Sequence, residues 1–127
     1  MTVPFELDVD PSKGRLYAKA TGKLTVDDFR SGLDRSIANR NFLPSLPQLF
    51  DLREAQYTPT DDDVEEMTAT LELLKYALKG KIALVAATQS LYLMGKLLAV
   101  RAETEGVALE VFVTIADAYE WLGVRQH

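Results

Sequence analysis

Three consecutive aspartates, Asp61 to Asp63, are the first residues in the chain whose type and spacing suggest chemistry. They stand in the stretch FDLREAQYTPTDDDVEEM, between a Thr-Pro-Thr sequence and a helical pattern. Carboxylates grouped in this way could offer hard oxygen ligands to Mg²⁺ or Ca²⁺. Adjacent residues of a helix point about 100° apart, however, so their side chains do not converge on one ion. Thr60 followed by acids is typical of a helix N-terminus, and we therefore predict a helix start and no metal site.

Asp51 and Arg53 form a second candidate, because alternation along a strand places both side chains on one face. They stand at the end of the short strand QLFDL, and ligands of open α/β sheets favour the carboxyl ends of strands. A structural ion pair is the favoured interpretation, although a binding site stays open. Polar residues predicted at the same edge are Tyr57, Thr58 and Thr60 after this strand, Thr88 and Gln89 after the next, and Thr114 after the last.

The sequence contains no legible catalytic constellation. Its one histidine is the last residue, His127, and it has no cysteine, so a nucleophile activated by an ordered imidazole is not expected. Neither phosphate-binding glycine motif is present. We predict a protein that is not an enzyme and that uses no cofactor; a hydrolase built on Asp51 and Arg53 is the weakest hypothesis.

Composition narrows the class of protein further. The chain of 127 residues fits one domain, predicted over residues 1–127 with an ordered core of about 5–123. A net charge of −5 without a basic stripe argues against nucleic acid as a partner. No apolar run is long enough for a membrane span, and no secretory signal is recognisable at the start, so we expect a cytoplasmic protein.

The hydrophobic pattern predicts an α/β protein with the element order ββαβαβαβα. An antiparallel hairpin opens the chain, and alternating strands and helices then imply mostly parallel pairing in a mixed sheet. Gly80 is predicted to end the second helix. The predicted elements are strands 5–9, 15–21, 48–52, 81–87 and 108–113, and helices that begin after Thr25 and span about 61–79, 90–106 and 115–123.

The third predicted helix carries a full turn of apolar residues, LYLM, at Leu91 to Met94. We expect Leu91, Leu93 and Met94 to cover the sheet, with Tyr92 directed towards solvent or a partner. Gly95 is unfavourable inside a helix and indicates the close approach of another element. The surplus apolar surface indicates either a contact or a hydrophobic ligand.

Several stretches together resemble the SpoIIAA-like, or STAS, domains, and more closely the stand-alone bacterial STAS/SEC14-like proteins. They are GKLTVDDF, FDLREA, IALVAA and, most specifically, EVFVTIADAYEWLG. The resemblance implies a five-stranded sheet in near-sequential order with helices largely on one face. It implies no shared enzyme activity. Anti-sigma-factor antagonists of this fold bind a kinase-like partner and are switched by phosphorylation of a serine at the start of the second helix.

This sequence departs from the family pattern at the switch. The serine should follow the strand ending at Asp51–Leu52, but no serine occurs between Arg53 and Ser90. Thr58, Thr60 and three acids stand there instead, and a phosphate beside those acids would be repelled. Because of this departure, we predict a module of this type without the serine phosphoswitch.

Two hypotheses of function follow. The favoured one is a non-enzymatic regulatory or protein-interaction module that binds a protein partner, a second copy of the chain included. Its surface would be loop 53–60 with the starts of the second and third helices. The alternative is a carrier for a small apolar ligand or lipid on the third helix. The candidate surface residues are Asp51, Arg53, Tyr57, Thr58, Thr60, Thr88, Gln89, Tyr92 and Met94.

Overall fold

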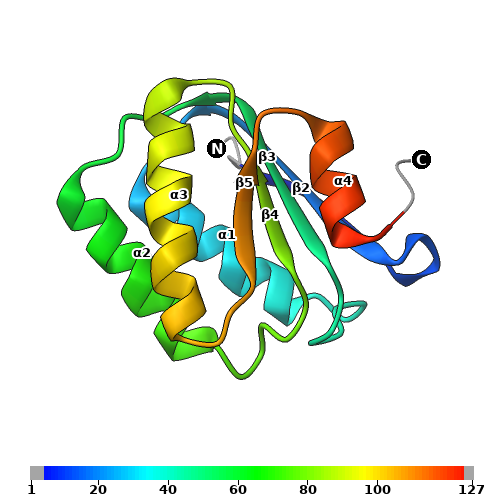
Figure 1. Cartoon of the computed structure of the whole chain (residues 1–127). Helices are drawn as coiled ribbons and strands as arrows, with labels where there is room; N and C mark the ends of the chain where they lie inside the picture. Colours follow the sequence, from blue (N-terminus) through cyan, green and yellow to red (C-terminus); the bar gives the residue numbers. More distant parts are fainter. Residues whose placement is uncertain (1–4, 125–127) are drawn as a thin grey trace.

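A computed structural model of the protein describes residues 5–124, so His127 lies outside the described residues. Within them, five strands form one sheet in the sequential order β1-β2-β3-β4-β5 (Figure 1). The β1–β2 pair is antiparallel and the other three pairs are parallel, which confirms the predicted order ββαβαβαβα. The strands are β1 (Phe5–Asp10), β2 (Arg15–Lys23), β3 (Gln48–Gln56), β4 (Ile82–Val85) and β5 (Leu109–Phe112).

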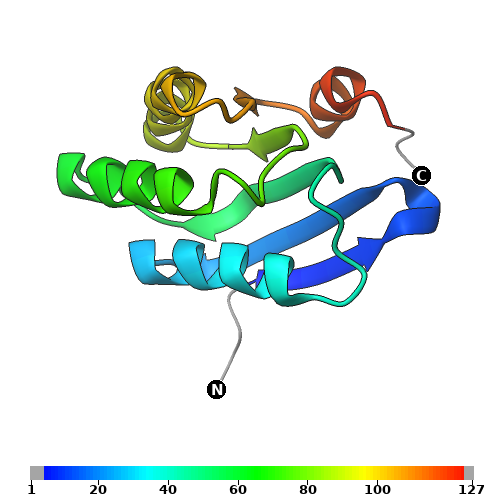
Figure 2. The same ribbon diagram turned by 90° about the horizontal axis from the view of Figure 1, so that it is seen from below.

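Three helices cover one face of the sheet, and the fourth packs on the other face (Figure 2). The expectation of helices largely on one face is thus confirmed, with the last helix as the exception. Within residues 5–124, no helix is long and apolar enough to cross a membrane. The helices are α1 (Val26–Ala38), α2 (Asp61–Leu74), α3 (Gln89–Thr104) and α4 (Ile115–Leu122), with a short 3₁₀ turn, Pro11–Lys13, in the opening hairpin.

Strand alternation divides the apolar side chains between the two faces. Under α1 to α3, the rings of Phe5, Phe29 and Phe50 meet with centroids 6.0 to 6.3 Å apart. Such edge-to-face and offset contacts add to the stabilisation by burial. The smaller cluster under α4 contains Leu49 and Tyr119, and both are buried. Helices thus pack against both faces of the sheet, and the ends of its strands carry the loops.

The prediction that α2 runs to Lys79 and ends at Gly80 is wrong. The helix ends at Leu74, and the next residues turn back, so that Lys79 and Gly80 donate backbone hydrogen bonds to the carbonyl oxygen of Pro44. A Cβ on Gly80 would lie 2.5 Å from the carbonyl oxygen of Leu46. This glycine therefore serves a close backbone approach, which a sequence pattern alone does not distinguish from a helix cap.

Strand β3 is longer than the predicted 48–52, because the extended β2 continues to pair with it as far as Gln56. Between Lys19 and Thr21 the register shifts, so that Ala20 faces both Leu52 and Arg53. This is a β-bulge, in which two residues of one strand oppose one of its neighbour. The predicted loop 53–60 is consequently shorter, and residues 53–56 belong to the sheet.

Helix α3 corrects the expectation for the LYLM turn. Leu91 and Met94 are buried as predicted, but Leu93 is exposed and Tyr92 is half-buried against the core. The reason is the helical period, which places residue 93 about 200° from residue 91 and opposite the sheet. Gly95 does mark a close approach, since an added Cβ would lie 2.6 Å from the Cβ of Val111 in β5.

Candidate functional site

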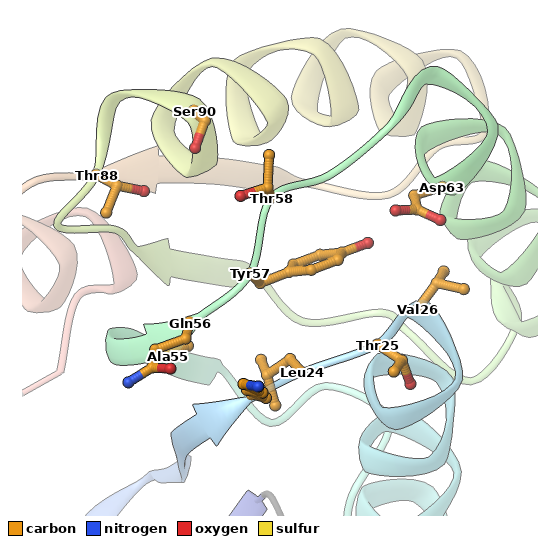
Figure 3. Close-up of a pocket in the computed structure, with 11 residues that line it drawn as sticks. Leu24, Thr25, Val26, Ala55, Gln56, Tyr57, Thr58, Asp63, Thr88 and Ser90 are labelled. Atoms are coloured by element: carbon orange, nitrogen blue, oxygen red, sulfur yellow. The ribbon is translucent and has the colours of Figure 1, made fainter.

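An open cleft of about 740 Å³ lies at the carboxyl edge of the sheet (Figure 3). The ends of β2 and β3 supply one wall, and the first residues of α1, α2 and α3 supply the rest. Its position is the one where parallel strands of α/β sheets usually meet ligands. The lining consists of residues 23–26 and 55–58 with Asp63, Thr88 and Ser90.

Threonine caps explain why three helices begin at this edge. The side-chain oxygens of Thr25, Thr60 and Thr88 each accept a hydrogen bond, 3.2 to 3.3 Å long, from a backbone N–H in the first turn of the helix. Each cap satisfies a donor that the helix itself leaves unpaired. Because the parallel strands all end here, the capped helix starts gather around one hollow.

The aspartates after Thr60 form the predicted helix start. Asp63 accepts a hydrogen bond of 3.1 Å from the backbone N–H of Thr60, which completes a reciprocal capping box. This backbone bond is the main reason why the pKa of Asp63 lies below its ordinary value. Within residues 5–124, no group of three or more His, Cys, Asp or Glu side chains could hold a metal ion.

Tyr57 is the most unusual side chain of the cleft. Its hydroxyl oxygen is buried and has no hydrogen-bond partner among the described residues. Figure 3 shows the ring crossing the cleft with its hydroxyl towards Asp63, although the geometry of a hydrogen bond is not reached. Burial, and then the nearby carboxylate of Asp63, raise the pKa of Tyr57. A buried hydroxyl without a partner in the protein is uncommon in folded proteins, and this one lies beside an open hollow.

Asp51 and Arg53 do not line the cleft. The Asp51 side chain is only 2% exposed, and the Arg53 guanidinium binds both of its carboxylate oxygens at 2.9 Å. The hydroxyl of Tyr17 donates a third hydrogen bond to Asp51, at 2.7 Å. These contacts make a closed network on the α4 side of the sheet, in agreement with the favoured interpretation as a structural pair.

The network shifts the pKa values of its members. Burial alone would raise the pKa of Asp51, but the hydrogen bonds from Arg53 and Tyr17 outweigh it and hold the pKa below its ordinary value. Burial, followed by the hydrogen bond to the Asp51 carboxylate, raises the pKa of Tyr17 to about 12. The carboxylate is thus held ionised and the phenol neutral, which is the arrangement of a stable structural contact.

A second, smaller groove of about 270 Å³ adjoins the cleft between the starts of α2 and α3. Ser90 lines both hollows and joins them into one surface. Most of the groove is apolar, with Val64 on one side and Leu93, Met94 and Leu97 on the other. The cleft is therefore the more polar part of the surface, and the groove is its more apolar part.

The predicted site residues separate into groups in the structure. Tyr57, Thr58 and Thr88 line the cleft, while Thr60 and Met94 line the groove. Gln89 is exposed and lines neither hollow, and the half-buried Tyr92 contacts the ammonium group of Lys96 instead. Thr114 caps α4, on the other face.

Several lining residues were not foreseen. The stretch Lys23 to Val26 belongs to the cleft because β2 runs parallel to β3, so both strands end at the same edge. That parallel pairing was predictable from the element order. Ala55, Gln56 and Ser90 fall within the predicted surface, in loop 53–60 and at the start of the third helix, but none of them was singled out. Leu97 depended on the exact rotation of α3.

Most polar side chains of the cleft that have an assigned hydrogen bond are engaged in capping the helices. Asp63 is the one carboxylate in the cleft lining, and its oxygen is already engaged in the capping box. The hydroxyls of Thr25 and Thr88 are engaged in capping as well. No nucleophile and general base within hydrogen-bond reach of each other can be assigned from these side chains.

Comparison with known proteins supports the fold. No protein-family model matches the sequence, and a comparison with curated proteins finds no match. The structure is similar to the crystal structure of an uncharacterised protein of the DUF3478 family with a SpoIIAA-like fold, from Shewanella loihica PV-4. The TM-score is 0.55 at 18% sequence identity, over 93% of this chain and 91% of the other. The chain therefore has a SpoIIAA-like fold, as its sequence led us to expect.

Proposed function

We propose that the protein is a non-enzymatic interaction module of the cytosol that binds a protein partner through the cleft and the adjoining groove. The observation that carries the proposal is the continuity of the two hollows through Ser90. A polar cleft beside an apolar groove resembles the anatomy of a protein interface, with an apolar centre and a polar rim. Leu93, 57% exposed at the rim of the groove, is available as an apolar contact.

Anti-sigma-factor antagonists of this fold are phosphorylated on a serine at the start of the second helix, and this chain has no serine there. That difference affects how such a module could be regulated. Thr58 is exposed in the cleft, but Thr60 is engaged in the cap of α2. A phosphate on Thr60 would remove the acceptor of that cap and would stand beside three carboxylates. The module is therefore expected to bind its partner without a phosphorylation switch at the start of α2.

The proposal can be tested by adding a bulky charge to the surface. A double variant that combines Thr58→Arg and Ser90→Arg should fill the cleft with two arginine side chains. When the tagged protein is used to capture partners from cell extract, this variant should retain at least tenfold less of the main partner than the natural protein. The matched control is Ala116→Arg on α4, an exposed position on the opposite face. Mass spectrometry identifies the partner, and thermal unfolding checks that each variant is folded.

The comparison of the two variants decides the outcome. Loss of one captured protein in the cleft variant, with retention in the α4 control, would support the proposal. Equal capture by all three proteins would contradict it, because binding would then not use this surface.

A second candidate function, carriage of an apolar ligand, is favoured by the groove alone. Val64, Met94 and Leu97 could contact an acyl chain laid between α2 and α3. Native mass spectrometry of protein purified from cells tests this idea. A mass above that of the chain, removed by organic extraction, would support a bound ligand, whereas the bare mass in every preparation would rule it out.

A further inference from the structure

The outer face of α3 carries a short apolar seam in the middle of the helix. Leu93, Leu97 and Val100 are 57%, 41% and 64% exposed, and they lie in one line on the side away from the sheet. Exposed Gln89 and Thr104 continue the same line at either end. From Leu93 to Thr104 the spacings of four, three and four residues are those of a coiled-coil seam, which keeps one stripe facing a partner helix.

We propose that this seam pairs two copies of the chain through antiparallel packing of their α3 helices. The inference deepens the proposed interaction function by naming one partner, a second copy. In a two-fold arrangement, Leu97 of one copy lies against Val100 of the other, and Leu93 lies against Thr104. The four central apolar side chains, two from each copy, would thereby leave water.

Charges beside the seam fit this arrangement. Lys96 and Glu103 are both exposed and lie one heptad apart on the same flank of the helix. The Lys96 ammonium donates one hydrogen bond to Glu110, at 3.2 Å, and its other N–H groups remain for a partner. When two such helices pack antiparallel, each flank meets the same flank of its partner, so Lys96 of each copy faces Glu103 of the other. A parallel arrangement would place Lys96 opposite Arg101, which is unfavourable. The charges therefore select the antiparallel orientation and a second copy as the occupant.

The nearby edge strand β5 is less suited to pairing. Alternation of backbone hydrogen bonds in a parallel pair directs the N–H of Val111 away from β4. The Glu110 carboxylate accepts this N–H at 3.1 Å and a hydrogen bond from Lys96 at 3.2 Å. A side chain that occupies an edge donor in this way discourages strand addition. The helix seam is thus the accessible contact at this end of the molecule.

The contact is small, so the dimer should be weak. One helix pair covers less surface than a standard interface, and interfaces at the low end are typically transient. We expect a dissociation constant of roughly 10–100 μM. Sedimentation equilibrium between low and high micromolar protein should show the monomer converting to a dimer, and a monomer throughout that range would overturn the inference.

Two substitutions separate the seam from the rest of the surface. Val100→Asp, which lines neither the cleft nor the groove, should weaken the dimer at least tenfold. The control is Leu73→Asp on α2, where a leucine 78% exposed lies on another helix and the dimer should be unaffected. Equal effects of both substitutions would overturn the inference.

A charge exchange tests the orientation. Lys96→Glu alone and Glu103→Lys alone should each weaken the dimer about three- to tenfold, because each creates like charges across the interface. The double variant restores opposite charges and should recover most of the loss. Failure of the double variant to recover would overturn the antiparallel register.

Cysteine cross-linking gives an independent measurement, because the natural chain contains no cysteine. A mixture of the Leu93→Cys and Thr104→Cys variants should form a disulfide-linked dimer on oxidation. Leu93→Cys alone should not, since the two copies of residue 93 would be separated by about 16 Å along the helices at 1.5 Å per residue. The reverse pattern would indicate parallel helices and would contradict the inference.

The proposed function and this inference can fail separately. A monomeric protein that still captures a partner through the cleft would overturn the dimer and leave the interaction function. A dimer broken by Val100→Asp, with no partner lost from the Thr58 and Ser90 variant, would support the dimer and contradict the cleft.

Discussion

Two tyrosines near the sheet, Tyr17 and Tyr57, show how differently similar side chains are used. Both are half-buried and both have raised pKa values. The hydroxyl of Tyr17 donates to Asp51 at 2.7 Å, whereas the buried hydroxyl of Tyr57 has no partner among the described residues. Tyr17 belongs to a closed network under the α4 side, and Tyr57 borders an open cleft.

The difference separates a polar group that is satisfied within the fold from one that is not. A buried network whose members satisfy one another rigidifies the fold and has nothing left to offer a ligand. A buried polar atom without a partner costs stability instead. The strand-end pair Asp51 and Arg53 is of the first kind, and the Tyr57 hydroxyl beside the cleft is of the second.

Removal of the carboxylate should have the largest effect on stability. Asp51→Ala leaves the Tyr17 hydroxyl and the inner part of Arg53 without their acceptor. We expect a loss of about 3 kcal/mol in the free energy of unfolding, as is typical when a buried charged partner is removed. Urea unfolding measures it, and a loss below about 1 kcal/mol would show that the network is not structural.

Tyr17→Phe should have the next largest effect. The substitution removes one hydrogen bond to a charged group, and we expect a loss of about 1.5 kcal/mol in the free energy of unfolding. The ring remains to pack beside the α4 cluster, so the cost of a cavity is avoided. A neutral result would contradict the network.

At acidic pH, replacement of Asp51 should reduce the free energy of unfolding by less than it does at neutral pH. Because its pKa in the folded protein is lowered, this carboxylate contributes stability above its unfolded pKa of about 3.9, and the contribution is lost as the pH falls through the folded value. The difference in the free energy of unfolding between the natural protein and Asp51→Asn should therefore be constant near pH 7 and shrink below about pH 4. A difference that grows in acid would contradict the lowered pKa.

Tyr57→Phe should have the smallest effect on stability, and it sharpens the comparison most. The hydroxyl makes no internal hydrogen bond, so its removal should change the free energy of unfolding by less than about 0.5 kcal/mol, or should stabilise the protein. A loss as large as that of Tyr17→Phe would show that the Tyr57 hydroxyl has a partner in solution and that the two regions do not differ.

Much of the fold could be predicted from the sequence because local signals agreed with one another. Period-two strands, threonine caps and the alternation of strands with helices gave the element order and the ion pair of Asp51 with Arg53. The end of α2 was missed, because the close approach of Gly80 to Leu46 depends on a distant part of the chain.

The candidate site was only partly predictable, for a similar reason. Thr58 and Thr88 follow strands and were placed at the correct edge. The bulge opposite Ala20 arises from the pairing of two strands, and it carries β3 to the wall of the cleft. The orientation of Leu93 depends on how α3 lies on β5, where Gly95 meets Val111. Such features are set by tertiary packing and have no local signature.

Amide hydrogen exchange of the protein, with and without its captured partner, tests the central claim most directly. We predict slower exchange in residues 57–64 and 88–97, which contribute to both the cleft and the groove, and unchanged exchange around Asp51 and in α4. Protection on the α4 side of the sheet, with none in those two segments, would contradict the claim that the carboxyl edge is the binding surface.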